Sequence, residues 1–107
     1  MIVYGGENID PAEVEIALMA HPAVSDCAVI GVPSERWGET VKAIVVTAPG
    51  AEVTADQLIV FARSLIAHYK TPSSVDFVAA LPRNPSGKVL KRELREPYWQ
   101  TVERRIN

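Results

Sequence analysis

The sequence predicts an α+β fold, with a small mixed or antiparallel sheet of about three main strands, helices packed on it, a short N-terminal strand and a basic C-terminal helix. Two segments rich in β-branched residues, 24–32 and 40–47, are typical of strands. Segments with the apolar spacing of amphipathic helices lie before the first and after the second of them. The 107 residues, of which 48% are apolar and 22% charged, have the size and balance of a single globular domain.

The first helix is marked at both ends. Asp10 suits the N-cap, Pro11 the first helical position, and Glu13 lies three residues after Asp10, which together make an Asp version of the capping box. The helix is expected to end near His21, because Pro22 disfavours a helical backbone at the residue before it.

Four strands and two loops are expected around the helices. A short apolar strand leads into a glycine-containing loop over 5–9, and a loop over 33–38 joins the two longest strands. The expected strands cover residues 1–4, 24–32, 40–47 and 75–79.

A second helix and a C-terminal helix complete the expected order of elements. Thr54 with Gln57 three residues later forms a capping box that predicts a helix start. This helix is expected to run to about His68. Its apolar stripe consists of Leu58, Phe61, Leu65 and Ile66. A basic helix is expected to begin within 88–95, and Pro97 is expected to kink or end it.

Several protein classes are excluded by the composition. The single cysteine, Cys27, rules out an internal disulfide framework and a Cys-rich zinc site, and its apolar surroundings predict a core position. His21 and His68 lie on different elements without cysteines or paired carboxylates beside them, so no metal site is expected. The longest strongly apolar run, 43–46, is far too short to span a membrane, and no signal peptide is visible. We therefore expect a protein of the reducing cytoplasm with no transmembrane segment.

The charge is unevenly distributed along the chain. Residues 1–80 hold four basic and ten acidic residues, whereas residues 81–107 hold seven basic and three acidic ones. A basic C-terminal segment on an acidic body indicates contact with an anion or an acidic surface, and a solvated helix face is the alternative.

Two segments carry residues that suit a functional site. Gly5 and Gly6 permit positive φ and a close approach of a ligand to the backbone, the alternative being a tight strand-to-helix turn. Lys88 follows the constrained segment 85–87 and can extend into a partner's cleft as a point charge, the alternative being an ordinary surface lysine. The segment is not a phosphate-binding P-loop, because Val89 stands where that motif needs Ser or Thr.

Three segments in this order resemble one family: 5–15 (GGENIDPAEVE), 31–39 (GVPSERWGE) and 81–92 (LPRNPSGKVLKR). They resemble the adenylate-forming acyl-CoA synthetases, which are related to luciferases and to nonribosomal-peptide adenylation domains. The resemblance reaches to about Trp99 and covers only the small, swinging C-terminal domain of that family. Residues 1–107 are thus identified as this single domain, without the large N-terminal domain, and the family's hinge residue is expected just before Met1.

The resemblance implies a ligase reaction in two steps. A carboxylate and ATP, with Mg²⁺, first give an acyl-adenylate and pyrophosphate, and the acyl group then passes to the thiol of CoA. In this family the small domain swings between two poses, one for each step. Lys88 matches the lysine that enters the active site for the first step. Gly5 and Gly6, with Glu7 and Asn8, match the loop that forms the pantetheine tunnel in the second.

The resemblance also implies substrates and partners. Arg83, Lys91 and Arg92 are expected to meet either the CoA phosphates or an acidic face of the large domain. The tail over 95–99 resembles that of bacterial fatty-acyl ligases, which implies a fatty acid as the carboxylic acid substrate. ATP and CoA are then substrates of the whole enzyme, while this fragment alone is expected to bind neither stably and to be inactive without its large domain.

A second interpretation of the chain is an autonomous small binding module. Its basic C-terminal helix would contact an anionic partner. Nucleic acid is not expected as that partner, because Tyr98 and Trp99 are the only aromatic residues near the basic segment that could stack on bases.

Overall fold

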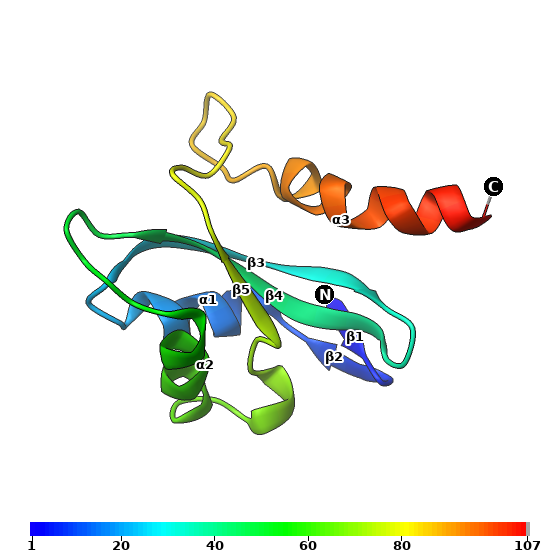
Figure 1. Cartoon of the computed structure of the whole chain (residues 1–107), viewed down its shortest axis with the longest axis horizontal. Coiled ribbons are helices and arrows are strands. Elements are labelled where there is room, and N and C mark those ends of the chain that lie inside the picture. Colours follow the sequence, from blue (N-terminus) through cyan, green and yellow to red (C-terminus); the bar gives the residue numbers. More distant parts are fainter. Residues whose placement is uncertain (107) are drawn as a thin grey trace.

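The structure is a computed structural model that describes the backbone of residues 1–106 and the side chains of residues 1–100. A mixed five-stranded sheet lies between helices on its two faces (Figure 1), which confirms the predicted α+β class. The elements in chain order are β1 (Ile2–Tyr4), β2 (Glu7–Ile9), α1 (Pro11–Met19), β3 (Val24–Ser34), β4 (Gly38–Thr47), α2 (Ala55–Arg63), a 3₁₀ helix (His68–Lys70), β5 (Ser74–Phe77) and α3 (Lys91–Ile106). None of the described helices is both long and apolar enough to cross a membrane.

A long antiparallel hairpin of β3 and β4 forms the largest part of the sheet, and β4 is its central strand. Its register is continuous except for an irregularity between Val24 and Asp26. On its other side, β4 meets β1 where Tyr4 lies opposite Gly38, and it pairs in parallel with β5. The strand order is β2-β1-β4-β3, so β3 is an edge strand of the sheet.

The core has two parts, one on each face of the sheet, because successive side chains of a strand point to opposite faces. One part packs beneath α1 and α2, and the other beneath α3 and the segment that precedes it. The first part includes Val14, Leu18, Cys27, Val29, Val41, Val45 and Leu58, and the second consists of Ala28, Ile30, Ile44 and Leu81. Since β3 is covered on both faces, apolar residues occupy its consecutive positions 27–30, as in a fully buried strand.

The structure corrects the loop expected over residues 5–9. These residues instead form a tight hairpin, in which Gly5 and Gly6 make a two-residue turn between β1 and β2. β2 was missed because its three residues become a strand only by pairing with β1.

Two helix boundaries also differ from the prediction. α2 ends at Arg63 rather than near His68, and Leu65, placed on its apolar stripe, is 53% exposed. α3 starts at Lys91 and continues through Pro97. Glu93 and Pro97 are both exposed, so water can bond to the carbonyl that Pro97 leaves without a donor.

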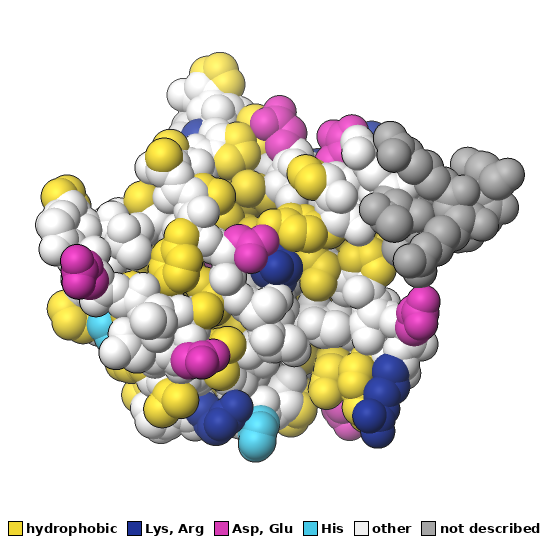
Figure 2. Space-filling model, viewed as in Figure 1, with side chains coloured by type: hydrophobic (Ala, Val, Ile, Leu, Met, Phe, Trp, Pro, Cys, Tyr) yellow, Lys and Arg dark blue, Asp and Glu magenta, His cyan; other side chains and the backbone are white. Residues whose placement is uncertain are grey.

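The fold joins the two oppositely charged parts of the chain. Arg83 pairs with Asp26 of β3, and Lys91 at the start of α3 pairs with Glu15 of α1 at 2.9 Å. On the face shown in Figure 2, side chains of both signs are dispersed and no region of one sign stands out. Part of the positive charge of the C-terminal segment is therefore neutralised within the molecule.

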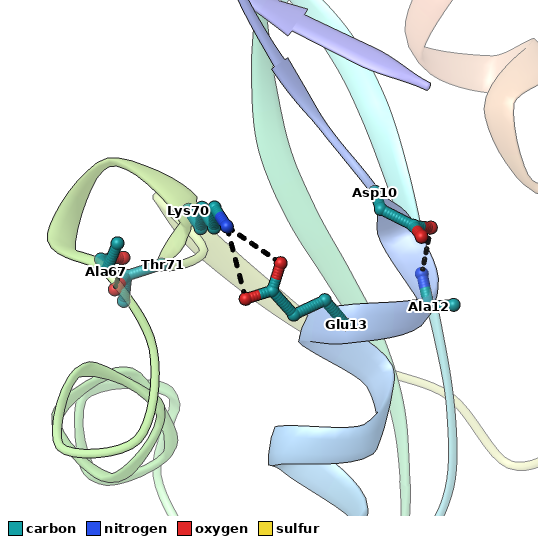
Figure 3. A network of polar contacts seen from close by, with 6 residues as sticks. All are labelled: Asp10, Ala12, Glu13, Ala67, Lys70 and Thr71. Carbon is teal, nitrogen blue, oxygen red and sulfur yellow. Dashed lines mark hydrogen bonds and ion pairs between the residues drawn. The ribbon is translucent and has the colours of Figure 1, made fainter.

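The start of α1 shows one half of the expected capping box. Asp10 accepts a hydrogen bond from the backbone amide of Ala12 at 2.9 Å, as an N-cap does. Glu13 turns the other way and binds Lys70 of the 3₁₀ helix at 2.8 Å (Figure 3), and this hydrogen bond is the main cause of a raised Lys70 pKa. The Thr54–Gln57 box at the start of α2 is complete.

Polar side chains attach α3 to the sheet. The Tyr98 hydroxyl donates a hydrogen bond to the carboxylate of Asp76 on β5, and Lys42 on β4 pairs with the same carboxylate at 3.0 Å. The indole N–H of Trp99 donates to the carbonyl of Gly31 at 3.0 Å. The hydrogen bond from Tyr98, and then that from Lys42, lower the pKa of Asp76. Burial is the largest cause that raises the pKa of Tyr98, to about 12, and the hydrogen bond to the charged Asp76 is the next.

Replacing Tyr98 by Phe keeps the ring and removes the donor to Asp76. We expect the free energy of unfolding to fall by about 1 kcal/mol, because a hydrogen bond to a partly exposed charged group is lost. Chemical denaturation measures the change. Tyr69→Phe, on the exposed 3₁₀ helix, is the control and should have little effect; an equal loss in both variants would contradict the role of Tyr98.

The contribution of Tyr98 should also depend on pH. A tyrosine in the unfolded chain ionises near pH 10, whereas Tyr98 in the fold does so at about pH 12. Its stabilisation is therefore complete below about pH 10 and is lost as the pH rises through about 12. Unfolding free energies of the wild type and of Tyr98→Phe should converge across this range, and a constant difference would argue against the raised pKa.

Candidate functional site

The segment between β5 and α3 folds into a small closed arch, residues 82–90. Its two legs pair through an isolated antiparallel bridge between Arg83 and Val89. The amide of Leu90 donates to the carbonyl of Pro82 at 2.9 Å and closes the base of the arch. Near the tip, Gly87 has a φ of +90°, a backbone conformation that favours glycine.

The side chain of Asn84 organises the tip of this arch. Its Oδ1 atom accepts hydrogen bonds from the amides of Ser86 at 3.1 Å and Lys88 at 2.9 Å, and from the Ser86 hydroxyl at 2.7 Å. The backbone N–H of Asn84 in turn donates a hydrogen bond to the carbonyl of Lys88 at 2.9 Å. The backbone of Lys88 is therefore held on both sides. The sequence analysis did not single out Asn84, although an Asn that begins a turn with Pro and Gly is a known signal for such side-chain bonds.

Arg83 links the arch to the body of the domain. Its Nη1 atom donates to the carbonyl of Gly87 at 2.6 Å, and its Nη2 atom donates to the carboxylate of Asp26. The other oxygen of Asp26 accepts the amide of Cys27 at 3.0 Å. Asp26 is a second residue that the sequence analysis missed, since its partner lies 57 positions away along the chain.

The structure brings together the four basic residues that the sequence singled out in its last third. Arg83, Lys88, Lys91 and Arg92 line one surface hollow of about 830 Å³ beside the arch. Two of the four form ion pairs within the domain, Arg83 with Asp26 and Lys91 with Glu15. Lys88 and Arg92 are exposed, and no acidic side chain in the described part of the chain forms an ion pair with either.

The second predicted segment is the hairpin turn between β1 and β2. Gly5 and Gly6 both have positive φ, +54° and +88°, as the favoured two-residue hairpin turn requires. A Cβ atom on Gly5 would lie 3.0 Å from the Trp37 ring, whereas one on Gly6 would meet nothing within 4 Å. Glu7 and Asn8 of β2 are exposed.

Contacts from the β3–β4 connection hold this hairpin in place. The amide of Gly5 donates to the carbonyl of Trp37 at 2.9 Å, and the Trp37 ring lies 5.0 Å from the ring of Tyr4. The carboxylate of Glu39 on β4 accepts the amide of Val3 at 2.6 Å. Trp37 thus packs against the hairpin and remains 38% exposed.

The structure does not bring the two segments together. Figure 1 shows the arch beyond the sheet on the side of α3, and the β1–β2 hairpin well separated from it at the lower right.

Cys27 lies next to the arch but belongs to the core. It is buried, and burial followed by the charges of Glu15 and Asp26 raises the pKa of its thiol to about 12. The thiol is therefore protonated at neutral pH, in agreement with its predicted place in the core.

Comparisons with known proteins agree on the family to which this chain is similar. Residues 13–88 match the family model described as the AMP-binding enzyme C-terminal domain. The chain is 45% identical over 106 residues to the fatty acid–acyl-carrier-protein ligase ScoC of Streptomyces coeruleorubidus, covering 99% of this chain and 20% of ScoC. It is 50% identical over 102 residues to a long-chain-fatty-acid–CoA ligase of Mycobacterium tuberculosis, covering 95% of this chain and 20% of that protein. Its fold matches that of ATP-bound MatB from Rhodopseudomonas palustris with a TM-score of 0.89 and 40% identity, covering 94% of this chain and 20% of MatB. The chain thus spans about a fifth of the length of these proteins.

Proposed function

The chain belongs to the family of AMP-binding enzyme C-terminal domains, and from that premise we propose that it is the mobile C-terminal domain of an ATP-dependent acid–thiol ligase. In this reaction a carboxylate oxygen attacks the α-phosphorus of ATP and pyrophosphate leaves. The thiol of CoA then attacks the acyl carbon of the adenylate, and AMP leaves. The names of the similar ligases support a fatty acid as the carboxylate.

The observation that carries this proposal is the geometry of Lys88. Its backbone is held by Asn84, while its side chain is exposed and has no acidic partner within the described residues. The first step brings together two anions, the carboxylate and the α-phosphate, so a cation between them lowers the barrier. Lys88 would supply this charge from a rigid base. The large N-terminal domain of the whole enzyme would bind ATP with Mg²⁺ and the acyl group. The C-terminal domain alone would be inactive.

The hairpin turn is assigned to the second step. Gly5 and Gly6 expose backbone without side chains, and Glu7 and Asn8 extend from the same turn. A narrow channel for the pantetheine arm of CoA can form against such a surface. Because the arch and this turn are far apart in one domain, the domain would have to change its orientation between the two steps.

The alternative of an autonomous anion-binding module gains no support from the geometry. Two of the basic residues that would form its surface, Arg83 and Lys91, are engaged in ion pairs within the domain.

Replacing Lys88 by Ala in the full-length enzyme should abolish most of the first step. Loss of a preorganised charge at a transition state typically costs ~10²–10³ in rate. Carboxylate-dependent exchange of labelled pyrophosphate into ATP measures this step, and formation of acyl-CoA from synthetic acyl-adenylate measures the second, which should be largely spared. Arg63→Ala, which removes an exposed cation of α2, is the matched control. Equal loss of both steps in Lys88→Ala would exclude the proposed role.

Replacing Gly6 by Leu should instead impair the second step. The new side chain would project into open space from the exposed turn, where the pantetheine arm is expected to pass. Gly50→Leu is a close control, because Gly50 also has positive φ (+75°) and open surroundings. Both variants carry a backbone strain of roughly 1–2 kcal/mol, so only the blockage should distinguish them. A normal rate of acyl-CoA formation from acyl-adenylate in Gly6→Leu would refute this assignment.

A further inference from the structure

Arg83 connects the arch to the most buried strand of the domain. One guanidinium nitrogen binds the carbonyl of Gly87, the residue directly before Lys88, and another binds the carboxylate of Asp26 on β3. A planar guanidinium can hold two acceptors in a fixed relative orientation. The position of the arch tip is thereby tied to the position of Asp26.

Asp26 is itself well anchored. It follows the irregularity in the β3–β4 register, and such bulges redirect a side chain away from its regular position. One of its oxygens is held by the amide of Cys27, which leaves the other for Arg83. The residues that follow it, 27–30, are buried. Asp26 therefore offers a rigid reference point at the edge of the sheet.

A second ion pair secures the other leg of the arch. Lys91, directly after the arch, binds Glu15 at 2.9 Å. The carboxylate of Glu15 also accepts the amide of Val29 on β3 at 2.8 Å. Both legs are thus fastened to the same strand, one through Asp26 and one through Glu15.

We propose that Arg83 and Asp26 form a positioning pair that sets the placement of Lys88 for adenylate formation. This inference rests on the proposed role of Lys88. The pair would not touch the substrates; it would hold the carbonyl of Gly87 and thereby the backbone from which Lys88 extends. Exposed ion pairs contribute little to stability. Loss of this pair should therefore lower the rate of adenylate formation and leave the free energy of unfolding almost unchanged.

Arg83→Met, Asp26→Asn and the double variant test the pair in the full-length enzyme. Asn can keep the oxygen that accepts the Cys27 amide. Its NH2 group, a donor, then replaces the oxygen that accepts from Arg83, so the link to Arg83 is broken. We expect each variant to lower kcat of the pyrophosphate-exchange reaction by roughly 10- to 100-fold, the cost of a small misplacement of a catalytic group. KM for ATP and for the carboxylate, and acyl-CoA formation from acyl-adenylate, should stay at their wild-type values. The double variant should lose no more than either single one, because both break the same link.

Two further variants sharpen the result. Arg83→Lys retains the charge and can reach one acceptor but not both in the same geometry, so it should recover part of the rate. Arg95→Met removes an exposed cation of α3 and is expected to leave adenylation unchanged. Hydrogen exchange of the segment 82–90 should accelerate in Arg83→Met and Asp26→Asn, even where thermal unfolding is unchanged.

Other outcomes would overturn the inference. If Arg83→Met raised KM for CoA in the second step while Asp26→Asn did not, Arg83 would bind the ligand and not position the arch. Wild-type adenylation in both variants would exclude the positioning role. Lys88→Ala, measured in the same assays, separates the two proposals: if it also kept full adenylation, the proposed function itself would fail.

Discussion

The burial of β3 on both faces is the constraint on which the rest of this domain depends. An edge strand ordinarily leaves one row of backbone groups unpaired. Here that edge is occupied by side chains: Glu15 accepts the amide of Val29, and Trp99 donates to the carbonyl of Gly31. With α1 and α2 against one face and α3 against the other, a shift of one residue would exchange the two sets of buried side chains, so the register of β3 is strongly determined.

The candidate site takes its rigidity from this strand. Asp26 of β3 holds Arg83, and Glu15, itself bonded to β3, holds Lys91, so the acidic body and the basic C-terminal segment meet at the base of the arch. The arch adds its own bonds, and Lys88 is left as an exposed ammonium on a fixed backbone. A charge that is already in place requires no reorganisation when a reaction proceeds, which is the condition for electrostatic catalysis.

Different interactions hold the hairpin turn between β1 and β2. Its form depends on the positive φ of Gly5 and Gly6 and on contacts with Trp37 and Glu39. The two candidate segments thus lie on separate surfaces of one domain (Figure 1). This separation gives the proposed exchange of poses a structural basis, because each surface can be presented without rebuilding the other.

The sequence by itself determined the α+β class, the helix starts and the motif around Lys88, because caps, apolar spacing and turn residues act within a few positions of one another. The complete capping box at Thr54 is an example. Only the tertiary structure decided which distant partners meet. Glu13 leaves its expected box for Lys70, and Arg83 turns to Asp26, each across 57 positions of the chain. β2 likewise exists only through its pairing with β1. Such contacts depend on how the helices pack around β3, and no local pattern in the sequence encodes that packing.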